Sequence, residues 1–172
     1  MSNLFETREA VFSPDRKYRY RLRQIWNKNL PCLCFLMLNP STADETKNDP
    51  TVERCERRAR ATENCGGVEI INIFAYRATD PNIMKAQTDP IGPYNDKHIL
   101  EAATNAAQLI IAWGKHGQHM TRGEQVLSLL RDNAIKPYHL KINKDGFPAH
   151  PLYISYNVQP APYNITGAYH AY

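Results

Sequence analysis

The order of apolar and polar residues along the chain predicts alternating strands and helices. Largely apolar runs at residues 33–38, 68–74 and 109–113 have the length and composition of buried strands, and a further strand is expected at 138–142. Segments with apolar residues at helical spacing lie between these runs. They predict helices at 52–61, 95–107 and 124–133, and Asp80-Pro81 marks the start of a short helix.

This strand–helix order is typical of an α/β sheet with parallel crossovers. We therefore expect a three-layer α/β/α fold around a short, four-stranded, mainly parallel sheet. A period-two alternation near the N-terminus predicts one additional edge strand. Its two faces carry Tyr18, Tyr20 and Leu22 on one side and Arg19, Arg21 and Arg23 on the other. A length of 172 residues fits a single domain with its core at about 11–155 and a surface tail at 156–172.

Composition excludes several classes of protein. With 42% apolar and 22% charged residues, the chain is typical of a globular protein and not of a disordered one. No apolar run approaches the ~18 residues of a membrane span, and the N-terminus carries no secretory signal, so a cytoplasmic protein without a membrane partner is expected. The four cysteines include no CxxC pair, which favours buried thiols over a metal cluster, and no cofactor is expected.

Candidate chemistry lies where the predicted strands end, because ligands of open α/β sheets bind beyond the carboxyl ends of the strands. The first buried strand is followed by Asn39, Pro40, Ser41 and Thr42. Asn72 lies within the second strand, which Tyr76 and Arg77 follow. The third strand ends at Trp113, and His150, Leu152 and Tyr153 come after the fourth. We expect these segments to meet at one edge of the sheet.

Several motifs resemble those of an uncharacterised bacterial and phage family, a domain of unknown function marked by its NPSTAD segment. The matching segments are NPSTAD at 39–44, AYRATDP at 75–81, AWG at 112–114 and HPLY at 150–153. The resemblance covers about residues 11–155 and implies no activity.

The order of these segments is also similar to that of the uracil-DNA glycosylase superfamily, which has a short α/β/α sheet. That superfamily carries a catalytic Gly-x-(Asp/Asn)-Pro-type loop after its first strand, and an Asn often ends the second strand. A Trp-Gly-type turn follows the third strand and a His-Pro loop follows the fourth. In this sequence the four motifs correspond, in the same order, to Asn39-Pro40, Asn72, Trp113-Gly114 and His150-Pro151.

This resemblance implies roles for individual residues. Asn39 orients the water that attacks the sugar carbon, and His150 donates a hydrogen bond to the departing base. Asn72 binds the edge of an extruded base, and Leu152 with Tyr153 forms a wedge that enters the duplex. Further substrate contacts are expected from Pro40, Ser41, Thr42, Tyr76, Arg77 and Trp113. Phosphate contacts are expected from Arg19, Arg21 and Arg23, together with Arg77.

Departures from the glycosylase pattern keep other functions open. The first loop lacks the Asp that the most active branch uses as a base, and Asp44, Glu45 and Asp49 place acidic charge beside the expected groove. The leading hypothesis is hydrolysis of the N-glycosidic bond of a nucleobase in DNA or a nucleotide. One alternative is a non-catalytic nucleic-acid or nucleotide-binding protein. The other is a metal-assisted enzyme of nucleotide or phosphoester chemistry that uses these three carboxylates. Oligomeric state is left open, and tyrosines of the tail fit either base stacking or an oligomer contact.

Overall fold

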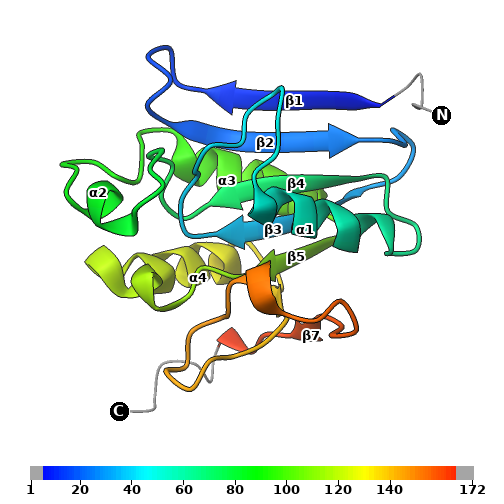
Figure 1. Cartoon of the computed structure of the whole chain (residues 1–172). Coiled ribbons are helices and arrows are strands. Elements are labelled where there is room, and N and C mark those ends of the chain that lie inside the picture. Colours follow the sequence, from blue (N-terminus) through cyan, green and yellow to red (C-terminus); the bar gives the residue numbers. More distant parts are fainter. Residues whose placement is uncertain (1–5, 166–172) are drawn as a thin grey trace.

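The computed structural model describes residues 6–165 and shows a single mixed sheet with helices on both faces (Figure 1). Its strands are β1 (Thr7–Phe12), β2 (Arg19–Ile25), β3 (Cys32–Met37), β4 (Gly67–Asn72), β5 (Gln108–Ile111), β6 (Tyr138–His139) and β7 (Ala161–Pro162). Its helices are α1 (Pro50–Arg60), α2 (Pro81–Lys85), α3 (Asn95–Asn105) and α4 (Arg122–Asp132), with two 3-10 helices, η1 (Lys115–Thr121) and η2 (Pro151–Tyr153). None of the helices in the described part of the chain is long and apolar enough to cross a membrane.

The strand order is β1-β2-β4-β3-β5-β6-β7. β3 runs parallel to β4 and to β5, β6 joins β5 in parallel through one residue pair, and the remaining neighbours are antiparallel. The predicted α/β class is confirmed. The expectation of one additional edge strand is wrong, because β1 lies beyond β2 at one end of the seven-stranded sheet and β7 extends the other end. The strand expected at 138–142 stops at His139, since Ile142 pairs with Pro148 instead.

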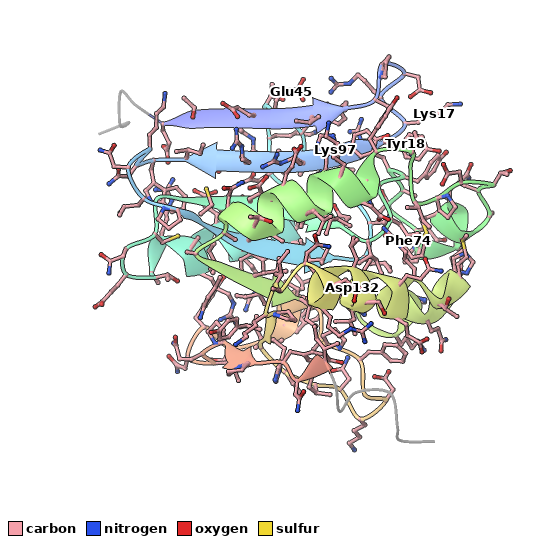
Figure 2. All side chains as sticks on the ribbon, turned by 180° about the vertical axis from the view of Figure 1, so that it is seen from behind. Lys17, Tyr18, Glu45, Phe74, Lys97 and Asp132 are labelled. Atoms are coloured by element: carbon pink, nitrogen blue, oxygen red, sulfur yellow. The ribbon has the colours of Figure 1, made fainter. Side chains whose placement is uncertain are left out.

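Helices cover the two faces of the sheet. α1 lies in front of β3 and β4 in Figure 1, and the view from behind in Figure 2 shows α3, which carries Lys97, and α4, which carries Asp132. The core is correspondingly divided into two clusters. Alternate residues of β3 contribute to each cluster, with Phe35 in the cluster that includes α1 and Leu36 in the one that includes α3 and α4. This division follows from the period-two geometry of a strand.

The cysteines are free thiols. Cys34, Cys55 and Cys65 are buried, and Cys32 is half-buried. Burial raises the pKa of the Cys32 thiol to about 11, which keeps it protonated near neutral pH. These thiols act as small apolar side chains of the core.

A bulge in β2 changes the direction of its arginines. Val11 pairs with Arg21 and Phe12 pairs with Arg19, so Tyr20 is an extra residue in the ladder. Arg21 lies on the α3 side, where it pairs with Glu69 at 2.5 Å and with Glu101 of α3 at 3.3 Å. Arg19 instead donates from Nη1 to the Ala43 carbonyl at 2.7 Å, on the α1 side of the sheet. The prediction that these arginines share one basic face is therefore wrong.

The start of the expected surface tail is attached to the body of the protein. Arg58 of α1 donates to the carbonyls of Ile154, Ser155 and Val158 at 2.7–3.0 Å, and Ala161 pairs with His139 in β6. The last part of the tail, with Tyr169 and Tyr172, lies outside the described residues.

Candidate functional site

A cavity of about 400 Å³ opens where β3, β4 and β5 end. The segments that follow these strands form its walls, together with the N-terminus of α1 and the loop before η2. It brings together seven of the residues expected to act in catalysis or to bind substrate or phosphate: Arg19, Asn39, Pro40, Ser41, Asn72, Trp113 and His150. The volume lies in the range typical of small-molecule and cofactor sites.

The side-chain amide of Asn39 has a defined orientation. Its Nδ2 donates to the Ala78 carbonyl at 2.7 Å and to the Pro40 carbonyl at 3.2 Å. Carbonyl oxygens accept but do not donate, so the nitrogen of the amide must face them. Oδ1 is left as an acceptor for a ligand or a water molecule.

His150 is held in one tautomer. Its Nδ1 accepts the backbone N–H of Leu152 at 3.2 Å, so in the neutral ring the proton sits on Nε2. The residue as a whole is exposed, yet the surrounding protein removes water from the ring and lowers its pKa below the usual value, against a smaller opposing effect of the Asp49 charge. At neutral pH the ring therefore offers an Nε2–H donor without carrying a positive charge.

Asn72 and Arg19 are the most deeply buried polar groups of the cavity, and each is 2% exposed. Asn72 stands at the end of β4, where it pairs with Met37 of β3. Its Oδ1 has no hydrogen-bond partner among the described residues, and neither has Nε of Arg19. Burial lowers the pKa of Arg19 to about 10, partly offset by the charge of Asp49. The guanidinium remains charged at neutral pH but is poorly compensated by the protein.

Asp49 supplies the one carboxylate among the described residues that line the cavity. Its Oδ1 accepts the N–H of Val52 at 2.9 Å and so caps α1, whose first residue is Pro50. The sequence predicted that Asp49 caps a helix and could bind a metal, but it did not predict that Asp49 lines a cavity together with Asn39. The position of Asp49 depends on the loop before α1, which rises across β2 to β1 (Figure 1). Arg8 holds this loop, because its Nε donates to the Asp44 carbonyl at 2.8 Å.

Trp113 and His116 form the wall contributed by the segment after β5. The indole of Trp113 is 2% exposed and packs so closely against Gly117 that a Cβ at that position would lie 2.3 Å from Trp113 Cδ1. His116 Nδ1 lies 2.8 Å from the Lys85 ammonium of α2. Burial, together with the charges of Lys85 and Lys115, lowers the pKa of His116. Because Trp113 is in close contact with Gly117, we expect its indole to form a rigid, uncharged part of the wall.

The other residues predicted for the site do not line the cavity. Thr42 is exposed, and Leu152 and Tyr153 lie on η2, with Tyr153 93% exposed. Tyr76 packs edge-on against Tyr18. The remaining three are basic and have partners within the protein. Arg77 donates to the Arg16 carbonyl and lies over the Phe12 ring, Arg21 pairs with Glu69 and Glu101, and Arg23 pairs with Glu9.

The three carboxylates considered as metal ligands have separate structural roles. Asp44 accepts hydrogen bonds from Thr46 and Lys47, which lower its pKa to about 2. Glu45 pairs with Arg16 at 3.1 Å, and Asp49 caps α1. Within residues 6–165, no group of three or more His, Cys, Asp or Glu side chains is placed to hold a metal ion.

Comparison with known proteins identifies a family. Neither the curated proteins nor the solved structures contain a significant match to this chain. A family model described as a protein of unknown function (DUF1643) matches residues 19–152. The matched region includes all the strands from β2 to β6 and every residue that lines the cavity. The chain belongs to the DUF1643 family.

Proposed function

We propose that the strand-end cavity binds a nucleobase and that the protein hydrolyses the N-glycosidic bond between that base and its sugar. The observation that carries the proposal is the meeting of Asn39, Asn72 and His150 around one cavity, with the free Oδ1 of Asn39 and the Nε2–H of His150 available to a ligand. These are the side chains whose order along the chain resembles that of uracil-DNA glycosylases.

Asn39 and Asp49 act on the water. Oδ1 of Asn39 accepts a hydrogen bond from the water and holds it in place, because the amide nitrogen is occupied by two carbonyls. An amide is too weakly basic to remove a proton, so Asp49 takes that role. The oxygen of the water bonds to the sugar carbon as the bond from that carbon to the base nitrogen breaks, and the proton of the water passes to the carboxylate.

His150 and Asn72 act on the base. The departing base carries away the electron pair of the broken bond, and a neutral Nε2–H donor stabilises the negative charge that develops on it. Asn72 lies deep in the cavity at the end of β4, where its amide fits a hydrogen-bonding edge of the base. The apolar surfaces of Trp113, Met37 and Leu38 enclose the flat faces of the ring.

A nucleotide, or a single-stranded segment, fits the surface better than a long duplex. Arg21 and Arg23, which were expected to bind phosphates, are paired with Glu69, Glu101 and Glu9. Binding of a duplex backbone needs unpaired Lys and Arg side chains that displace counterions. A non-catalytic nucleotide-binding protein is the second candidate function, because Asn39 stands where the most active glycosylases carry a catalytic Asp.

Release of free base separates the two candidates. Deoxynucleotides, and single- and double-stranded oligonucleotides carrying each common base, uracil or hypoxanthine, are incubated with the protein, and free base is measured by chromatography and mass spectrometry. We expect release from at least one substrate and its loss in Asn39→Ala and His150→Ala, with folding checked by circular dichroism.

Asn133→Ala and His139→Ala are matched controls, because Asn133 also donates its amide to a backbone carbonyl and neither residue lines the cavity. These controls should keep wild-type rates. Binding without base release from any substrate would reject hydrolysis and support the second candidate.

A further inference from the structure

The deepest part of the cavity contains a donor and an acceptor that the protein leaves without partners. Arg19 Nε and Asn72 Oδ1 are both buried and make no hydrogen bond within residues 6–165, although both residues are only 2% exposed. Buried polar atoms of this kind are rare, because leaving one unsatisfied costs about 1–3 kcal/mol. Both side chains line the cavity, so a ligand that enters it becomes their partner once these two atoms, which are closed off from solvent in the unliganded protein, turn toward it.

The unused donors of Arg19 lie along one edge of its guanidinium. Nη1 is committed to the Ala43 carbonyl at 2.7 Å, and this leaves the edge formed by Nε and Nη2. Arg19 forms no ion pair among the described residues. The carboxylates whose charges act on it, Asp49 and Asp44, accept hydrogen bonds from backbone N–H groups instead. A guanidinium edge presents two parallel N–H groups and matches two acceptor atoms that lie side by side on a ligand.

We propose that the cavity selects a 6-oxopurine, guanine or hypoxanthine, through Arg19 and Asn72. One edge of a 6-oxopurine presents N7 and O6 as neighbouring acceptors, followed by the N1–H donor. The Nε–Nη2 edge of Arg19 binds N7 and O6, and Asn72 Oδ1 accepts N1–H. Each side chain turns slightly toward the ligand, a change that is common on binding.

Adenine and uracil match this pattern less well. Adenine places an amino donor where O6 would be, so a donor of the base faces a donor of Arg19. Uracil has no second acceptor beside O4, and half of the guanidinium edge stays unpaired. Because an unpaired buried group costs free energy, the site discriminates against both bases. Cytosine presents O2 and N3 as neighbouring acceptors, so dCMP is the strongest competitor in a binding test.

This inference rests on the proposed nucleobase cavity and names its base, and equilibrium binding tests it without need of catalysis. Calorimetric titration compares dGMP, dIMP, dAMP, dUMP, dCMP and 7-deaza-dGMP, which differs from dGMP only in the N7 acceptor. We expect dGMP and dIMP to bind most tightly, and dAMP and 7-deaza-dGMP to bind about 5- to 150-fold more weakly. Equal affinity for dGMP and 7-deaza-dGMP, tighter binding of dUMP, dCMP or dAMP, or no binding of any nucleotide would overturn the inference.

Arg8 provides a matched control for Arg19. Both arginines hold the loop before α1 by donating to its carbonyls, Arg8 to Asp44 and Lys47 and Arg19 to Ala43, but only Arg19 lines the cavity. Arg19→Met removes every donor of the side chain while keeping a long side chain in its place. It should abolish the preference for dGMP over 7-deaza-dGMP, whereas Arg8→Met should keep it. Preference retained in Arg19→Met, or lost equally in Arg8→Met, would contradict the assignment.

The outcomes for binding and for hydrolysis are separate. Selective binding of 6-oxopurines without base release would support this inference and reject hydrolysis. Release of uracil by a protein that shows no preference for dGMP over 7-deaza-dGMP would support hydrolysis and reject the inference.

Discussion

Asp49 acts both as the cap of α1 and as the proposed general base, and the substitution Asp49→Asn separates these two roles. Its Oδ1 caps α1 by accepting the N–H of Val52 at 2.9 Å, and the same side chain is the carboxylate of the cavity. Asn caps helices about as well as Asp, so Asp49→Asn keeps the cap and removes the negative charge. Asp49→Ala removes both.

The two substitutions should differ in stability and agree in activity. Asp49→Asn loses the attraction between a carboxylate and the helix N-terminus, which lowers the free energy of unfolding by about 0.3–1 kcal/mol. Asp49→Ala also loses the cap, a further ~0.5–2 kcal/mol. General-base catalysis contributes about 10²–10⁴ to a rate, so base release should fall by that factor in both variants. Urea unfolding and initial rates of base release measure the two effects.

Asp80→Asn is the control for this pair, because Asp80 caps α2 by accepting the N–H of Asn82 at 2.8 Å and does not line the cavity. Asp80→Asn should change neither the free energy of unfolding nor the rate of base release by much. Base release by Asp49→Asn within threefold of the wild-type rate would refute the role of Asp49 as a base. Equal stability of Asp49→Asn and Asp49→Ala would refute its role as a cap.

Other predictions concern pH, a buried ion pair and the cavity wall. Burial lowers the pKa of His98, His116, His139 and His150 in the folded protein, so the unfolded chain binds more protons as pH falls through about 6.5. The free energy of unfolding should therefore decrease from pH 7 to 5.5, as measured with urea; an increase would contradict these shifts. Glu69→Gln leaves the Arg21 guanidinium without its buried partner, and we expect a loss of about 3–5 kcal/mol in the same assay. Gly117→Ala forces a methyl group against Trp113 and should cost about 1–3 kcal/mol while weakening nucleotide binding; unchanged stability would show that the indole moves freely.

Much of the site could be predicted from strand ends alone. Asn39, Asn72 and Trp113 each lie at or just after a largely apolar run, and parallel strands bring such positions to one edge of a sheet. The helix starts were also visible, since Asp49-Pro50 and Asp80-Pro81 both form the expected caps. Strand ends and helix caps depend on residues that are close together in the sequence, so the sequence alone was enough to predict them.

The remaining features depend on contacts between distant parts of the chain. The bulge at Tyr20 interrupts the alternation of β2 and sends Arg19 to the opposite side of the sheet from Arg21, and nothing in the alternation of side chains marks that position. Asp49 reaches the cavity because its loop is tied to β1 by Arg8, 36 residues from Asp44 in sequence. β1 itself, with the sequence TREAVF, is half-exposed and has too few apolar residues to predict a strand.

The central claim is that the strand-end cavity is a nucleobase site, and chemical-shift mapping with dGMP tests it most directly. Titration should perturb the side-chain amides of Asn39 and Asn72 and the indole N–H of Trp113, because all three residues line the cavity. Perturbations confined to Arg57 and Thr62, which line a separate cavity of about 440 Å³ beside α1, would contradict the claim, as would a titration that perturbs no residue.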